Sequence, residues 1–268
     1  MLTSTVMGEP DRPHRAPAVD ERLVMPETRA EILRGALLMP PPADEPHGTS
    51  HFDLTYVLAA HVAPEYRGAV DMLTRTSGDS DFAPDASVFP KARDPKTGGR
   101  QLEELAFEIV GEQWMGVPSE KARELARRGV RRIFCVVLQY LPARGGPRDN
   151  QRVLEWSRET DGWKMLAEDA HIEDRCFATR LPIRALLHAS EVDTAVVAAL
   201  RERGALRELE GEWREEGRLA ARRASVLDLC EALDVDLTDE RRAHVEALDA
   251  PALEAFIEAL KRERRWPA

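Results

Sequence analysis

The fold of this chain is decided by "SDFAPDASVF" (80–89), "LEELAFEIV" (102–110) and "VPSEKARELARRGVRRIFCVV" (117–137). The first two segments predict strands, and the third predicts a helix that is followed by a strand. The run "RRIFCVVLQYL" (131–141) alternates too little for a strand with one exposed face, so it predicts a buried central strand. Elements in this order are typical of an α/β core with a mixed sheet.

Three charged residues stand out in these segments. Asp85 opens the first strand, Glu108 lies inside the apolar second strand, and Lys121 begins the helix. Two carboxylates on adjacent strands can hold a hard divalent cation through oxygen ligands. A nearby ammonium can orient or activate a water molecule and steady charge on a phosphate. Together they are the minimum set for metal-dependent hydrolysis of a phosphodiester bond.

Longer motifs around these residues carry a resemblance to a known family. They are "AEILRGALLMPPPADEPHGTSHFDLTYVLAAHV" (30–62), "FAPDASVF" (82–89), "LAFEIV" (105–110) and "KARELARRGV" (121–130). Over residues 20–190 the chain resembles the Uma-type putative restriction endonuclease family of the PD-(D/E)XK nuclease superfamily. In that family an apolar residue stands two positions after the motif glutamate, as Val110 does here. The lysine lies on the following helix, eight residues before a Gly-Val pair, as Lys121 precedes Gly129-Val130.

The resemblance implies a restriction-endonuclease-like α/β fold, in which helices flank a mixed sheet, and a metal-dependent endonuclease that hydrolyses DNA. It implies that Asp85 and Glu108 bind the metal and that Lys121 assists the attacking water. It also implies that Glu31, in the first hairpin, and His47, before the first helix, can approach the metal or the water. Because the expected ligands are oxygens alone, we expect Mg2+ or Mn2+.

Each of these residues also has a purely structural interpretation. Asp85 follows a proline at a strand entrance, where an aspartate often caps local backbone amides. Glu108 needs a cation or hydrogen-bond donors if its strand is buried, but alternation could turn it to solvent. Lys121 could be an ordinary surface lysine, Glu31 an exposed strand residue, and His47 a helix-start histidine bonded locally.

Two departures from the family pattern keep an alternative function open. The turn after the glutamate strand is "GEQWMG" (111–116) instead of serine-rich, and the last core strand ends in Val137 where an aspartate is common. Neither change touches the three charged positions. The alternative is a catalytically inactive protein that keeps this fold and acts as an interaction or assembly module.

The charge balance bears on the expected partner. A net charge of -10 and a pI near 5.3 argue against nucleic-acid binding, because nonspecific affinity for DNA comes largely from Lys and Arg that replace phosphate counterions. However, Arg123, Arg127, Arg128 and Arg131 crowd the motif helix and its exit. They predict a local basic surface and weak DNA binding, or else an ordinary solvated helix face.

The chain divides into three parts by composition. Residues 1–20 are rich in proline and charge and predict a disordered tail, and residues 21–190 form the nuclease-like domain. Residues 191–268 predict a helical C-terminal extension. Leu206, Trp213, Ala220 and Leu227 recur every seven residues, which favours either self-association through these helices or a helix docked on its own domain.

Several residues predict where helices begin. Thr49 or Ser50 would cap a helix that reaches Val62, and Ser119 would cap the motif helix near residue 118. Thr238 and Asp249 would cap two short helices near the C-terminus.

The remaining composition narrows the class of protein. No apolar run approaches the ~20 residues of a membrane helix, and the N-terminus lacks an apolar signal core, so we expect a cytoplasmic protein. Cys135, Cys176 and Cys230 lack CxxC spacing, which predicts buried thiols instead of a disulfide framework or a zinc site. The absence of GxxxxGK[ST], GxGxxG, HExxH and GxSxG patterns removes the common phosphate-loop, dinucleotide, zincin and serine-hydrolase classes.

Overall fold

A computed structural model describes residues 17–25, 28–40, 42–111, 115–138 and 151–267. The chain forms two compact units that divide after Arg203. Of the tail predicted over residues 1–20, residues 1–16 lie outside the described residues. Residues 17–20 are part of the first unit: Val19 is buried, and its carbonyl accepts a hydrogen bond from the Arg75 amide at 3.1 Å.

The first unit is built on a six-stranded sheet of order β10-β9-β8-β7-β6-β3. Neighbouring strands pair antiparallel, except for the parallel pair β7 and β8. A parallel pair needs a crossover connection, and helix α2 supplies it. The mixed sheet confirms the predicted α/β fold class. The elements are β3 (Tyr66–Val70), β6 (Ala86–Pro90), β7 (Leu105–Val110), α2 (Gly116–Arg128), β8 (Arg132–Val137), β9 (Arg152–Ser157) and β10 (Gly162–Met165).

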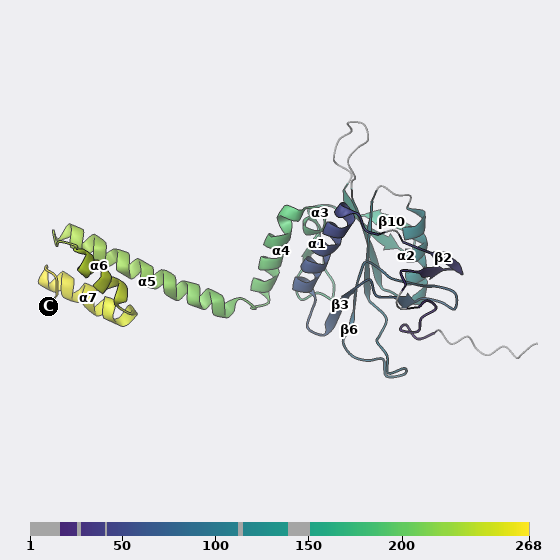
Figure 1. The fold of residues 1–268 in the computed structure, drawn as a ribbon, viewed down its shortest axis with the longest axis horizontal. Helices are drawn as coiled ribbons and strands as arrows, with labels where there is room; N and C mark the ends of the chain where they lie inside the picture. The colour runs from purple at the N-terminus through teal and green to yellow at the C-terminus, as the bar shows by residue number, and fades with distance from the viewer. Residues whose placement is uncertain (1–16, 26–27, 41, 112–114, 139–150, 268) are drawn as a thin grey trace, which may run out of the picture. The chain divides into compact units, whose positions relative to one another are not determined.

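Helices cover both faces of this sheet (Figure 1). Leu105, Phe107 and Ile109 of β7 join one apolar core, which is covered by α1 (Glu45–His61), α3 (Arg184–Leu187) and α4 (Ala189–Glu202). Ala106, between them, joins a second core with Leu125 of α2. Successive side chains of a strand point to opposite faces, so Glu108 lies on the same face as Ala106, toward α2.

A second, four-stranded sheet of order β2-β1-β5-β4 lies on the α2 side of the molecule. It contains β1 (Glu31–Leu33), β2 (Ala36–Leu38), β4 (Thr74–Arg75) and β5 (Asp81–Phe82). Arg34 and Gly35 form the turn of the β1–β2 hairpin with positive φ angles of 51° and 75°. Leu33 and Phe82 pack in the same core as Leu125, which brings the Glu31 strand over the face that carries Glu108. A separate short pair joins β11 (His171–Ile172) and β12 (Leu181–Pro182).

Two predicted helix starts are wrong. Helix α1 begins at Glu45 because the Asp44 side chain accepts a hydrogen bond from the His47 amide at 3.1 Å, so Thr49 and Ser50 lie inside the helix. Helix α2 begins at Gly116, and the Ser119 hydroxyl donates to the Met115 carbonyl instead of capping the helix. Lys121 therefore lies in the second turn of α2, where the sequence predicted the first.

The second unit contains α5 (Arg207–Ala232), α6 (Asp239–Ala247) and α7 (Ala250–Glu263). The predicted caps are confirmed, because the Thr238 and Asp249 side chains accept hydrogen bonds from backbone amides in the first turns of α6 and α7. The compact units do not divide at the predicted residue 191. Helix α4 belongs to the first unit, since Val192 and Val196 are buried in its main core.

Helix α5 is packed along only part of its length. Val226 and Cys230 belong to the core that α5 shares with α6 and α7, whereas residues 211–218 are exposed and the Trp213 side chain is 57 % accessible. All three cysteines are buried and free, as predicted. Within the described parts of the chain, no helix combines the length and apolar content that a membrane crossing requires.

Candidate active site

Asp85 and Glu108 meet across strands β6 and β7. The antiparallel register pairs Ala86 with Phe107, so Asp85 and Glu108 occupy the next opposed positions. Directly opposed residues have Cβ atoms about 4.5–5.5 Å apart on one face of the sheet. The Asp85 Oδ2 atom accepts a hydrogen bond from the Ile109 amide at 2.5 Å. This bond fixes one carboxylate oxygen, as the capping interpretation of Asp85 predicted.

Glu108 is a buried carboxyl group on the α2 side of the sheet. Its side chain is 7 % exposed, and its Oε1 atom has no hydrogen-bond partner among the residues that the structure describes. Burial raises the pKa of Glu108 to about 8, and the negative charges of Asp85 and Glu31 act in the same direction, while Lys121 opposes them. An uncompensated buried carboxyl group is costly for a fold. This position therefore favours a positive charge that the metal-free chain supplies only in part.

Lys121 provides that partial compensation from α2. Its Nζ atom lies 2.9 Å from Glu31 Oε2 and 4.0 Å from Glu108 Oε1, and its side chain is 11 % exposed. Burial lowers the pKa of Lys121, but the attraction of Glu108 and Glu31 outweighs this effect and raises it. Lys121 is thus a buried cation directed at the carboxylates instead of a surface lysine.

Glu31 holds Lys121 in place. Its Oε1 atom accepts hydrogen bonds from the Ala83 amide at 2.9 Å and from Lys121 Nζ at 3.2 Å. Because Ala83 lies between β5 and Asp85, Glu31 also connects its own hairpin to the segment that presents Asp85. Glu31 is buried, so the interpretation as an exposed strand residue is wrong.

His47 approaches the site from the first turn of α1. Its Nε2 atom lies 3.7 Å from Asp85 Oδ1. The interaction with Asp85 raises the pKa of His47, although partial burial acts in the opposite direction. Its ring stacks on the His51 ring with centroids 6.3 Å apart.

Sequence reasoning missed His51 and Asp71, which also contact Asp85. His51 Nε2 lies 2.7 Å from the Asp85 carbonyl oxygen and 3.7 Å from Asp71 Oδ1. His51, Asp71 and Asp85 each offer one ligand atom to a metal, and these atoms lie within 4.8 Å of one another. The spacing of His47 and His51, four residues apart on one helix face, was a signal available in the sequence.

The arginines predicted to bind DNA already have partners within the protein. Arg123 contacts Asp161 and Glu120, and Arg127 lies 3.0 Å from Glu124. The remaining two also have partners. Arg128 donates to the Pro17 carbonyl, and Arg131 binds Asp174 and Glu104.

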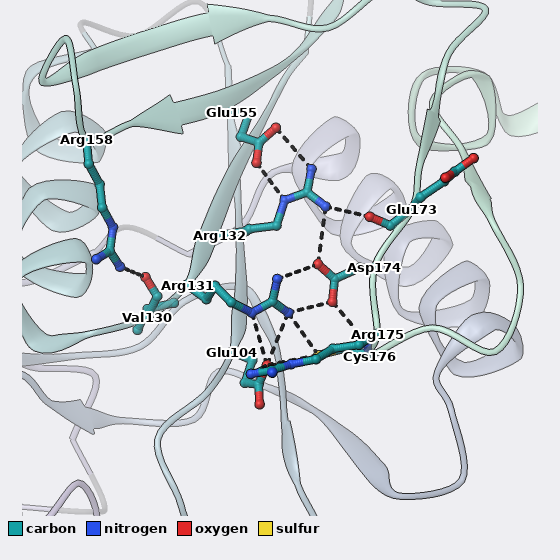
Figure 2. Close-up of polar contacts among 10 residues, drawn as sticks. All are labelled: Glu104, Val130, Arg131, Arg132, Glu155, Arg158, Glu173, Asp174, Arg175 and Cys176. Carbon is teal, nitrogen blue, oxygen red and sulfur yellow. Dashed lines mark hydrogen bonds and ion pairs between the residues drawn. The ribbon is translucent and has the colours of Figure 1, made fainter.

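Figure 2 shows the network around Arg131. Arg131 and Arg132 both bind Asp174, at 2.6 and 3.2 Å, and Arg132 also binds Glu155 at 2.6 Å. Burial raises the pKa of Asp174, but hydrogen bonds from Arg131, the Cys176 amide and Arg132 prevail and hold it well below its usual range. The network ties the loop around Asp174 to the start of β8, which indicates a structural role.

The site thus gathers Asp85, Glu108, Glu31 and Lys121 on one side of the sheet. Oxygen atoms of Asp85 and Glu108 suit a hard divalent cation, and the unpartnered Glu108 Oε1 is the buried polar atom that such an ion would satisfy. The Lys121 ammonium lies next to these oxygens and can donate to a water molecule or a phosphate oxygen.

Comparison with known proteins gives one family match. Residues 19–170 match the family model Uma2, described as "Putative restriction endonuclease". The matched range contains all the site residues described above. No curated protein is similar enough to this chain to count as a relative.

Proposed function

We propose that this chain, which belongs to the Uma2 family of putative restriction endonucleases, is a metal-dependent endonuclease that hydrolyses phosphodiester bonds of DNA. The family supports a nuclease. The observation that carries the metal dependence is the buried Glu108 carboxyl group, whose Oε1 atom lacks a hydrogen-bond partner beside Asp85. A structural carboxyl group in such a position would be expected to have its hydrogen bonds satisfied.

Asp85 and Glu108 would hold the ion, and Mg2+ or Mn2+ suits two carboxylate ligands. When bound, such an ion polarises the scissile phosphate, lowers the pKa of a bound water, and stabilises the leaving oxygen. The Ile109 amide donates a hydrogen bond to Asp85 Oδ2. This bond fixes the orientation of the carboxylate, so that its other oxygen is available to the ion.

Lys121 and Glu31 act on the water and the phosphate in this proposal. Glu31 accepts from Lys121 Nζ at 3.2 Å, which leaves ammonium protons for other acceptors, since an ammonium carries three. Lys121 would orient the attacking water and steady the developing negative charge. Glu31 is then a positioning residue, because it acts through Lys121.

DNA contact would involve the arginines of α2 and its exit. Arg127 is 62 % exposed and lies 3.0 Å from the buried carboxylate of Glu124, which Arg34 also contacts at 2.8 Å. Arg127 would therefore turn to a DNA phosphate while Arg34 keeps Glu124 paired. Since the whole molecule carries a net charge of -10, we expect weak binding that falls steeply as salt rises.

The alternative is an inactive protein with this fold that serves assembly. The internal pairing of the predicted DNA-binding arginines favours it, as does the exposed Trp213 on α5. A calorimetric titration with Mg2+ or Mn2+ separates the two, because only the enzyme needs the ion that Asp85 and Glu108 would hold.

The direct experiment is incubation of the protein with supercoiled plasmid and Mg2+ or Mn2+, beside Glu108→Ala and a chelator control. The proposal expects nicked or linear plasmid from the wild-type protein alone. Intact plasmid in every lane, from protein that is folded, would favour the assembly module.

A further inference from the structure

A group of possible ligands beside the proposed centre has no part in the mechanism above. His51 comes from α1, Asp71 follows the last residue of β3, and Asp85 precedes the first residue of β6. One nitrogen or oxygen atom from each lies within 4.8 Å of the other two. His51 and Asp71 were not needed to bind the first ion or to place Lys121, so their convergence on Asp85 calls for its own explanation.

The backbone holds these residues together. The register of β3 and β6 pairs Val70 with Ala86, which makes Asp71 and Asp85 the next opposed residues. The Asp71 amide donates to the Asp85 carbonyl oxygen at 3.4 Å, and His51 Nε2 lies 2.7 Å from the same oxygen. Helix α1, the end of β3 and the start of β6 are therefore held together at the Asp85 carbonyl oxygen by contacts that need no metal ion.

The spacing suits a single cation. His51 Nε2 and Asp71 Oδ1 are 3.7 Å apart, and nitrogen and carboxylate ligands lie about 2.0–2.2 Å from a transition-metal ion. Two ligands on opposite sides of such an ion are then about 4 Å apart, and adjacent ligands are closer. Small side-chain rotations bring the three atoms into that range, with Nε2 exchanging the Asp85 carbonyl for the ion.

The charge balance points the same way. Asp71, Asp85, Glu31 and Glu108 are close enough for the first three to act electrostatically on Glu108, and Lys121 is the ammonium that faces them. Independently, Glu108 is a buried carboxyl group with an oxygen that no donor reaches. Glu31 and Glu108 are buried, Asp85 is partly buried and Asp71 is exposed, and this excess of carboxylates over cations favours the binding of added positive charge.

We propose that His51, Asp71 and Asp85 form a second divalent-cation position, which shares Asp85 with the proposed nuclease centre and prefers a transition metal to Mg2+. The preference follows from the imidazole, because Mg2+ favours oxygen ligands and keeps its water, whereas imidazole suits transition metals. Affinity should rise from Mn2+ to Co2+. Binding at this position does not depend on the proposed function; only its use in cleavage, as the second ion of a two-metal site, does.

The test is a calorimetric titration of the full chain with Co2+ alone, without DNA, together with the visible absorption of bound Co2+ as a readout of an imidazole ligand. His51→Gln removes the nitrogen ligand but keeps an N–H donor for the Asp85 carbonyl. Asp71→Asn changes a side chain that is 74 % exposed, so the fold should be unaffected. Asp169→Asn, at an exposed turn residue, is the matched control.

We expect both His51→Gln and Asp71→Asn to weaken Co2+ binding by at least about tenfold, which is the lower end of the loss on removing even an outer-shell partner. His51→Gln should also change the Co2+ spectrum, and Asp169→Asn should change nothing. Unaltered Co2+ affinity in the two variants would overturn the proposal, as would loss of Co2+ binding in Glu108→Gln alone.

The outcome is distinguishable from that of the proposed function. If Co2+ binding depends on His51 and Asp71 but the plasmid stays intact, the second position stands and the nuclease proposal fails. If the plasmid is cleaved but Co2+ affinity does not change in His51→Gln and Asp71→Asn, the nuclease proposal stands and the second position fails.

Discussion

Replacement of Glu108 by glutamine should stabilise the metal-free protein while abolishing its proposed activity. Glu108 is buried, its Oε1 atom has no hydrogen-bond partner, and its pKa is raised to about 8. In the folded protein the carboxyl group therefore stays protonated up to about that pH, whereas in the unfolded chain it ionises near 4.5. Glutamine keeps the size of the side chain and removes the ionisation.

The magnitude and its pH dependence follow from the two pKa values. Between pH 4.5 and 8 the folded state holds a proton that the unfolded state has released, so wild-type stability falls as pH rises through this window. A pH of 7 lies 2.5 units above the pKa of 4.5 that Glu108 has in the unfolded chain. At about 1.4 kcal/mol per unit, the wild-type protein should therefore have a free energy of unfolding about 3 kcal/mol lower than that of Glu108→Gln. Below pH 4.5 the free energies of unfolding of the wild-type protein and Glu108→Gln should converge.

Urea unfolding in the presence of a chelator measures this difference, at pH 4 and at pH 7. Glu159→Gln is the control, because Glu159 is 89 % exposed and should change stability little. Added Mg2+ should stabilise the wild-type protein, by about 2.7 kcal/mol at a hundred times its Kd, and leave Glu108→Gln unchanged. A variant that is less stable than wild type at pH 7, or a difference that is the same at both pH values, would refute the reasoning.

Four further predictions concern other parts of the molecule. Lys121→Ala should abolish cleavage but retain calorimetric metal binding, and it should cost about 3–5 kcal/mol in urea unfolding because buried Glu31 loses its cation; undiminished cleavage would contradict the role given to Lys121. Asp174→Asn should cost about 2 kcal/mol at neutral pH, since charge-assisted hydrogen bonds to Arg131 and Arg132 are lost. The depressed pKa of Asp174 makes this stabilisation disappear as pH falls through that pKa, so a gap that persists in acid would be inconsistent. Truncation after Arg203 should leave a folded, metal-binding unit that has lost self-association by light scattering, whereas an unfolded product would make the C-terminal helices part of the core. Charge reversal at Arg127 should weaken binding to all DNA sequences alike and reduce the salt dependence, and binding that is indifferent to it would place the DNA elsewhere.

The central part of the fold was predictable because its signals are local. The apolar runs of β7 and β8 and the helix between them are all present as predicted. The meeting of Asp85 with Glu108 followed from the expectation that their strands are neighbours. The role expected of Lys121 came from the resemblance and not from its own surroundings in the sequence.

Other features depend on contacts that a sequence does not display. Asp71 adopts a φ angle of 48° and separates β3 from β4. That same residue reaches His51 and Asp85 only because β3 pairs with β6. The start of α1 was predictable in principle, since Asp44 precedes Glu45 and Pro46, which is a common pattern at helix starts.

The internal partners of the charges on α2 could not be predicted, for a long-range reason. The partners of Arg123 and Arg131 are Asp161 and Asp174, which are far away in the sequence and reach these arginines through the β9–β10 turn and the loop after β11. A count of basic residues along one helix cannot reveal such compensation.

The central claim is that an ion held by Asp85 and Glu108 enables cleavage of DNA. Its most direct test is the single-turnover cleavage rate of a labelled duplex as Mg2+ is raised, for the wild-type protein, Asp85→Asn and Glu108→Gln purified in the same way. We predict a rate that rises and saturates with Mg2+ for the wild-type protein and no cleavage by either variant. A rate that survives a chelator, or that Glu108→Gln retains, would contradict the claim.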